Sequence, residues 1–165
     1  MAGKQLISLT FRPTYVSSSD TWVPQKGFDC LTLEGVPTTE DTCAFDTSGF
    51  DPSESSTFKP YPDTNFNITY GSGEFLTGNV GFDTVQIGGL AVKGQEIGLV
   101  TKAAWNGHGV SSGLMGLASP NLTSVFAGID PVEDKAQLPY NSFFYTAVQQ
   151  KLVSHPCKRL RFASV

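Results

Sequence analysis

Residues 64–103 constrain the fold more than any other part of this sequence. They read "TNFNITY", "GSGE" and "FLTGNVGFDTVQIGGLAVKGQEIGLVTKA", and apolar and polar side chains alternate between glycine-containing turns. This period of two predicts β-strands. Within the run, residues 67–78 predict a β-hairpin, because glycines at its tip adopt positive φ without steric cost. With 17 Gly and 10 Pro in the chain, we expect a mainly all-β fold.

The remaining strands are predicted with less periodicity. Residues 5–11, "QLISLTF", predict a strand, and residues 21–24, "TWVP", predict a short one that ends at Pro24. Residues 25–57 are rich in Gly, Pro, Ser, Thr and Asp and predict a long loop. Residues 112–118, "SGLMGLA", predict a buried apolar run.

One helix is expected near residues 139–154. Ser142 is a suitable N-cap, and the spacing of Phe144, Val148 and Leu152 places them on one face, which we expect to be buried. Pro156 is expected to end this helix.

Length and charge exclude several classes of function. A chain of 165 residues allows one domain. A net charge of -4, with one basic cluster near residues 158–161, predicts no nucleic-acid binding. No apolar run approaches the roughly 18 residues of a membrane span, and the N-terminal "MAGKQLISLTFRP" lacks the features of a secretory signal.

The cysteines predict at most one local cross-link. Cys30 and Cys43 flank a loop and could form a disulfide in an oxidising compartment, which leaves Cys157 over. Only His108 and His155 could join them, and no C-x-x-C pair is present. We therefore expect no metal site, and no cofactor.

Five segments in order carry a resemblance to a known family. They are "SSSDTWVP" at 17–24, "FDPSESSTF" at 50–58, "ITYGSGEFLTGNVGFDTVQIGGLAV" at 68–92, "SSGLMGLA" at 111–118 and "NSFFYTAVQQKLVSHP" at 141–156. In this order the chain resembles pepsin-like aspartic proteases, especially the secreted fungal type. The resemblance implies one N-terminal acid-protease lobe over residues 1–156, with a flap hairpin and one or two short helices. A divergent basic tail at 157–165 would follow, with the second lobe absent.

The resemblance also assigns roles around the substrate cleft. In this family one aspartate from each lobe shares a proton and activates a water, while the flap closes over the peptide. Tyr70 matches the flap tyrosine and Trp22 the tryptophan that packs beneath it. The other matching positions are Gly71, Ser72 and Gly73 at the flap tip and Ser18 after the catalytic turn.

The sequence departs from the family at the catalytic turn. Counting back from Trp22, the catalytic aspartate is replaced by Tyr15, and Val16 and Ser17 stand in place of Thr-Gly. No Asp or Glu occurs in residues 1–19. The Asp-Thr-Ser-Gly run at 46–49 lies in the wrong part of the family's order to be catalytic. Whether the chain is an enzyme is therefore open, and we expect it to be inactive.

Three hypotheses follow from this conflict. The first is a truncated, inactive remnant of an aspartic endopeptidase, and the second is a pseudo-protease that binds peptides without cleaving them. The third is an active acid endopeptidase of which this sequence is a flawed reading. By resemblance the partner is a peptide or protein substrate, and exposed lobe surface predicts self-association or aggregation.

The cellular compartment is not decided by these features. The family is secreted, whereas this N-terminus shows no signal. Two sequons, at Asn67 and Asn121, would carry glycans only if the chain were secreted.

Overall fold

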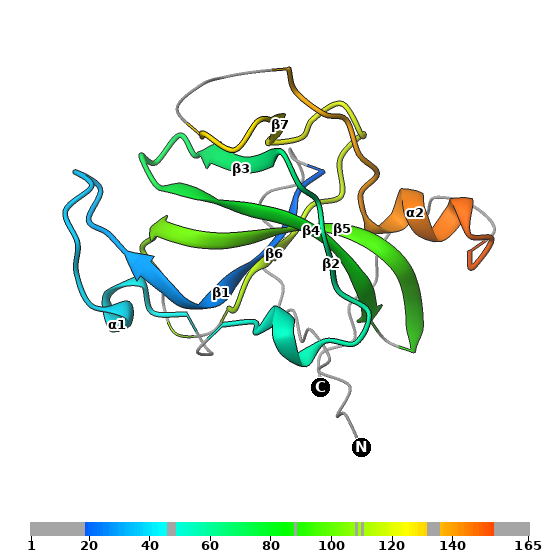
Figure 1. Cartoon of the computed structure of the whole chain (residues 1–165), viewed down its shortest axis with the longest axis horizontal. Coiled ribbons are helices and arrows are strands. Elements are labelled where there is room, and N and C mark those ends of the chain that lie inside the picture. The colour runs from blue at the N-terminus through cyan, green and yellow to red at the C-terminus, as the bar shows by residue number, and fades with distance from the viewer. Residues whose placement is uncertain are drawn as a thin grey trace.

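The chain folds around one curled β-sheet (Figure 1). The computed structural model describes residues 19–45, 49–87, 89–107, 109, 111–131 and 136–153. The elements in chain order are β1 (Thr21–Cys30), α1 (Glu40–Cys43), a 3-10 turn (Pro52–Glu54), β2 (Lys59–Pro60), β3 (Thr64–Thr69), β4 (Phe75–Ile87), β5 (Leu90–Ala104), β6 (Leu114–Met115), β7 (Val125–Ala127) and α2 (Phe143–Gln149). The expectation of a mainly β lobe with one or two short helices is confirmed.

The predicted strands of residues 64–103 form the centre of the sheet. Within the described residues the strand order is β6-β1-β5-β4-β3-β7, and β2 pairs with β4. The β3–β4 and β4–β5 pairs are antiparallel, whereas β1 runs parallel to β5. The β4–β5 register shifts between Thr77 and Gly78 and again between Asp83 and Val85. Such bulges bend and twist strands, which agrees with the curl of the sheet in Figure 1.

The prediction that Pro24 ends the first strand is wrong, because β1 continues to Cys30. Regular pairing of β1 with β5 pauses between Pro24 and Asp29, so the missing proline N–H falls at an irregular part of the ladder. The Pro24 carbonyl accepts the N–H of Phe50 at 2.7 Å. The loop predicted for 25–57 is therefore shorter than expected and also contains α1 and the 3-10 turn.

Two apolar clusters fill the space around the sheet. Trp22 and Phe66 lie in one, and Val85 and Phe143 lie in the other. Gly98 allows the first cluster to form, because a Cβ atom at this position would lie 2.9 Å from the Phe66 ring. Residues from β1, β3, β4 and β5 thus pack together in this cluster.

The predicted helix exists, but its buried face differs from the expectation. Ser142 is the N-cap residue, yet its side chain makes no capping hydrogen bond. Phe143 and Ala147 are the buried pair, whereas Leu152 is 43% exposed and lies beyond the end of α2. The face predicted from Phe144, Val148 and Leu152 is therefore wrong by one position, because the sheet covers the Phe143 side.

Some expectations fall on parts of the chain outside the described residues. These are the strand at 5–11, the end of the helix at Pro156 and the basic tail at 157–165. Within the described ranges, no helix is long and apolar enough to cross a membrane.

Candidate functional site

A tight turn joins β3 to β4 at residues 70–74. Strand pairing reaches Thr69 and Phe75, after which the Tyr70 N–H donates to the Glu74 carbonyl at 2.8 Å. The Gly73 N–H donates to the Tyr70 carbonyl at 2.9 Å, and Gly73 has a φ of +91°. Such a φ favours glycine over any residue with a side chain. Gly71, Ser72 and Gly73 are all exposed, so the turn presents mainly backbone to solvent.

Tyr70 lies over an aromatic cluster that begins at β1. The Trp22 indole N–H donates to the Tyr70 hydroxyl at 3.0 Å, which joins residues 48 positions apart. Trp22 is only 1% exposed, so this bond satisfies a donor that is removed from water. The structure thus brings together the two aromatic residues that the sequence singled out.

Two further aromatic residues, which sequence reasoning missed, complete this cluster. Trp105 contacts Trp22 edge to face with ring centroids 5.3 Å apart and Tyr70 with centroids 5.6 Å apart. Phe45 stacks on Trp105 at 6.2 Å and meets Trp22 at 6.1 Å. Edge-to-face pairs of this kind are favourable beyond the apolar area that they bury. A lone tryptophan directly after a long strand was the available signal for Trp105.

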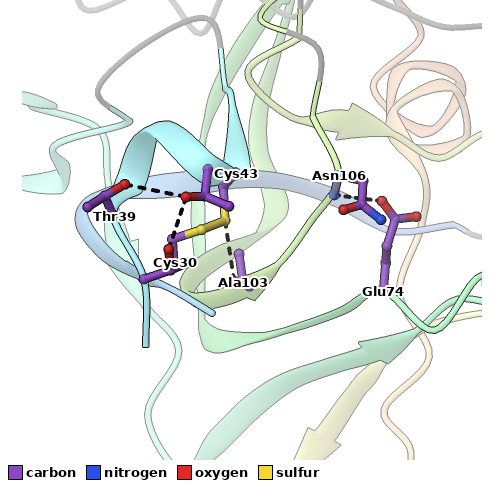
Figure 2. Close-up of a disulfide and its surroundings, with 8 residues drawn as sticks. Cys30, Thr39, Cys43, Glu74, Ala103 and Asn106 are labelled. Carbon is purple, nitrogen blue, oxygen red and sulfur yellow. Dashed lines mark hydrogen bonds between the residues drawn. A yellow bond between two sulfur atoms is a disulfide. The ribbon is translucent and has the colours of Figure 1, made fainter. Parts of the chain in front are cut away.

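The disulfide predicted from the cysteine spacing is present. Cys30 at the end of β1 is bonded to Cys43 at the end of α1, with Cα atoms 6.0 Å apart. Figure 2 shows that the bridge lies against β5, where the Cys43 sulfur is 3.4 Å from the Ala103 carbonyl oxygen. Phe45 follows two residues later, so the disulfide fixes the segment that carries Phe45 into the aromatic cluster.

A buried carboxylate immediately precedes β1. Asp20 accepts hydrogen bonds from the Ser124 N–H at 2.8 Å, the Tyr140 hydroxyl at 2.9 Å and the Thr123 hydroxyl at 3.3 Å. Its side chain is fully buried. Burial, followed by the charge of Asp20, raises the pKa of Tyr140 well above its ordinary value.

Glu96 on β5 is a second buried carboxyl group in the same region. Its Oε1 atom is buried with no hydrogen-bond partner among the described residues. Burial, and then repulsion from Asp20, raises the pKa of Glu96 to about 8 from an ordinary 4.5. At acidic and neutral pH the site therefore holds a neutral Glu96 beside Asp20. Sequence reasoning missed this site, although a glutamate inside an apolar strand was a visible signal.

Other predicted site residues have different outcomes. Tyr15 and Ser18 lie outside the described residues. Asn121 is exposed, whereas Asn67 is half-buried and its side-chain NH2 donates to the Pro131 carbonyl at 2.7 Å. Of the two sequon asparagines, Asn121 is therefore the more accessible. Within the described ranges, no cluster of three His, Cys, Asp or Glu side chains has the geometry of a metal site.

Comparisons with known proteins agree on one family. A family model described as eukaryotic aspartyl protease matches residues 16–158. A probable aspartic-type endopeptidase of Aspergillus fumigatus is 34% identical over 138 residues, which cover 82% of this chain and 29% of the relative. Mucorpepsin of Rhizomucor pusillus is 34% identical, with 84% and 30% covered, and pepsin A of Bos taurus is 33% identical, with 71% and 28% covered. The chain thus spans less than a third of each of these relatives.

Proposed function

Because this chain belongs to the eukaryotic aspartyl protease family of pepsin-like enzymes, we propose that it is a lobe of the aspartic endopeptidase type that does not itself hydrolyse peptide bonds. In this proposal residues 1–156 form the lobe and residues 157–165 a divergent tail. The turn at residues 70–74 is the flap, and Trp22 is the residue that supports it. Peptides are the ligand class that the family relationship supports.

The observation that carries the proposal is the residue at the catalytic position. Counting back from Trp22 gives Tyr15, and residues 1–19 contain no Asp or Glu. The family's chemistry requires two carboxyl groups that share a proton and activate water. A phenol ionises near pH 10 and is therefore a poor base at acidic pH. Asp20 is no substitute, because it is fully buried and accepts three hydrogen bonds from other parts of the lobe.

A proteolysis assay tests the proposal. The purified chain is incubated at acidic pH with an acid-denatured protein substrate, with and without the inhibitor pepstatin. Bovine pepsin A is the matched positive control. We expect no pepstatin-sensitive cleavage by this chain. Cleavage that pepstatin abolishes would show that the chain carries a working aspartate pair and would overturn the proposal.

Peptide binding without cleavage is a second candidate function. It is favoured by the hydrogen bond between Trp22 and Tyr70 and by the aromatic cluster beneath the turn, since aromatic side chains are frequent in binding sites. The chain has 2 tryptophans, and both Trp22 and Trp105 lie in this cluster. Titration of their fluorescence with a pepstatin-like peptide should give a saturable change. A flat titration would count against binding.

Self-association is a separate part of the proposal. Six large apolar side chains of the described residues are exposed, among them Ile129 at 79% and Val36 at 56%. Exposed apolar side chains favour association where they form a contiguous patch. Sedimentation over a range of protein concentrations should show species larger than a monomer, and a monomer throughout would refute this part.

A further inference from the structure

The Glu74 side chain joins the 70–74 turn to a distant loop. One carboxylate oxygen accepts the backbone N–H of Asn106 at 2.8 Å (Figure 2), and the other accepts the Ser72 hydroxyl at 2.7 Å. The Glu74 carbonyl also accepts the Tyr70 N–H at 2.8 Å. A single residue therefore closes the turn with its backbone and attaches it to the loop after β5 with its carboxylate.

This attachment acts next to Trp105. Asn106 directly follows Trp105, whose ring contacts both Tyr70 and Trp22. Trp105 also stacks on Phe45. Glu74 therefore restrains the backbone beside the indole that supports the Tyr70 ring.

The same loop is held from the disulfide side. The Gly109 N–H donates to the Ala44 carbonyl at 2.8 Å. Gly107 lies so close to the Cys43 and Ala44 carbonyls that a Cβ atom at this position would clash with both. The loop is thus fixed on the disulfide side by backbone contacts, whereas Glu74 connects it to the turn.

We propose that Glu74 is a positioning residue that latches the 70–74 turn to the Trp105 loop and thereby fixes the Tyr70 ring over Trp22. Hydrogen bonds to an ionised carboxylate are stronger than those between neutral groups, so the two bonds hold a turn that is otherwise exposed. The latch is a property of the lobe itself, and it goes beyond the question of whether the chain binds or cleaves a peptide.

Amide hydrogen exchange in Glu74→Ala and Glu74→Gln tests the latch. Loss of the acceptor in Glu74→Ala should accelerate exchange of the Asn106 amide about tenfold or more. It should also shift the tryptophan emission, because both tryptophans lie in the cluster. Glu74→Gln keeps an acceptor for Asn106, and the Ser72 hydroxyl can accept from its NH2 group. It should therefore return exchange to within about threefold of the wild type.

Two comparisons separate the latch from a general loss of stability. The Val100 amide, in the middle of β5, reports opening of the whole sheet, and we expect its exchange to change far less than that of Asn106 in Glu74→Ala. Glu54→Ala, which removes an exposed glutamate on the 3-10 turn, should change neither amide. Equal acceleration at Asn106 and Val100 would overturn the proposal.

The remaining outcomes also decide the question. Should Glu74→Ala not fold, Ser72→Ala removes one arm of the latch at an exposed position and should still accelerate exchange at Asn106 by a smaller factor. Unchanged exchange at Asn106 in the variants that fold, or no rescue by Glu74→Gln, would overturn the proposal. None of these readouts uses a peptide, so they are independent of the proteolysis and binding assays.

Discussion

Replacement of Glu96 by glutamine should make this lobe more stable at mildly alkaline pH. Glu96 is only 9% exposed, and its Oε1 atom is buried without a hydrogen-bond partner among the described residues. The titratable groups that face it are Asp20, before β1, and Tyr140, before α2. Ionisation of Glu96 would place a second negative charge beside Asp20 in a site with little water. Glutamine has nearly the same shape and never carries this charge.

The direction of the effect follows from the two pKa values. In the folded chain the pKa of Glu96 is raised to about 8, whereas its ordinary value is 4.5. The folded state therefore holds a proton that the unfolded state has released throughout this interval. The contribution of protonated Glu96 to the free energy of unfolding is fully present below about pH 4.5 and is lost as the pH rises to about 8. At about 1.4 kcal/mol per pH unit, the free energy of unfolding can fall by at most about 5 kcal/mol over this interval. Because the ionised Glu96 side chain would be partly hydrated, we expect a smaller fall of about 2–3 kcal/mol.

Urea unfolding across this pH interval measures the effect. The free energy of unfolding of the wild type should fall from about pH 4.5 to about pH 8, whereas that of Glu96→Gln should fall by about 2–3 kcal/mol less. Glu54→Gln, at an exposed position, serves as the control and should follow the wild type. If Glu96→Gln and the wild type lose stability in parallel, Glu96 is not the group that titrates, and the reasoning fails.

Four further substitutions test other parts of the structure. Tyr70→Phe removes the acceptor for the buried indole N–H of Trp22, which should lower stability by about 1–2 kcal/mol and shift tryptophan emission; unchanged emission would contradict the contact. Phe143→Ala should cost about 3–5 kcal/mol because its ring is buried, whereas Leu152→Ala, at 43% exposure, should cost under about 1 kcal/mol in the same urea titration. Cys30→Ser opens a cross-link between residues 13 apart and should lower the unfolding midpoint by the equivalent of about 3 kcal/mol; equal midpoints under oxidising conditions would refute this.

The fold was predictable where its determinants are local in sequence. Alternating side chains and glycine turns in residues 64–103 predicted the β3–β4–β5 hairpins, because each turn lies between the two strands that it joins. The prediction that Pro24 ends the strand was wrong, because Pro24 lies where the regular pairing of β1 with β5 is interrupted. The buried face of α2 misled for a related reason. The spacing of Phe144, Val148 and Leu152 fits a helix, but the position of the sheet decides which face is covered.

The candidate site was predictable only in part. The resemblance singled out Tyr70 and Trp22, which the structure joins by a hydrogen bond. It gave no indication of Glu74, because one partner of that carboxylate, the Asn106 N–H, lies 32 residues away on a loop. Such a contact depends on the curl of β4 and β5, and no pattern of residue types within either strand predicts it.

The neighbours Gln95 and Glu96 show why the buried carboxyl pair of Asp20 and Glu96 was difficult to predict from the sequence. Neighbouring residues on a strand point to opposite faces, so the period-two pattern predicts that one of the two is exposed. Both are buried, because β5 is covered on both sides. The Gln95 side chain donates to the Asn141 carbonyl, just before α2, at 3.0 Å, and Glu96 lies toward Asp20. A strand covered on both faces accepts a glutamate most readily when it is neutral. Glu96, which departs from the alternating pattern of the strand, is therefore the residue from which we expect the lobe to be more stable at acidic than at alkaline pH.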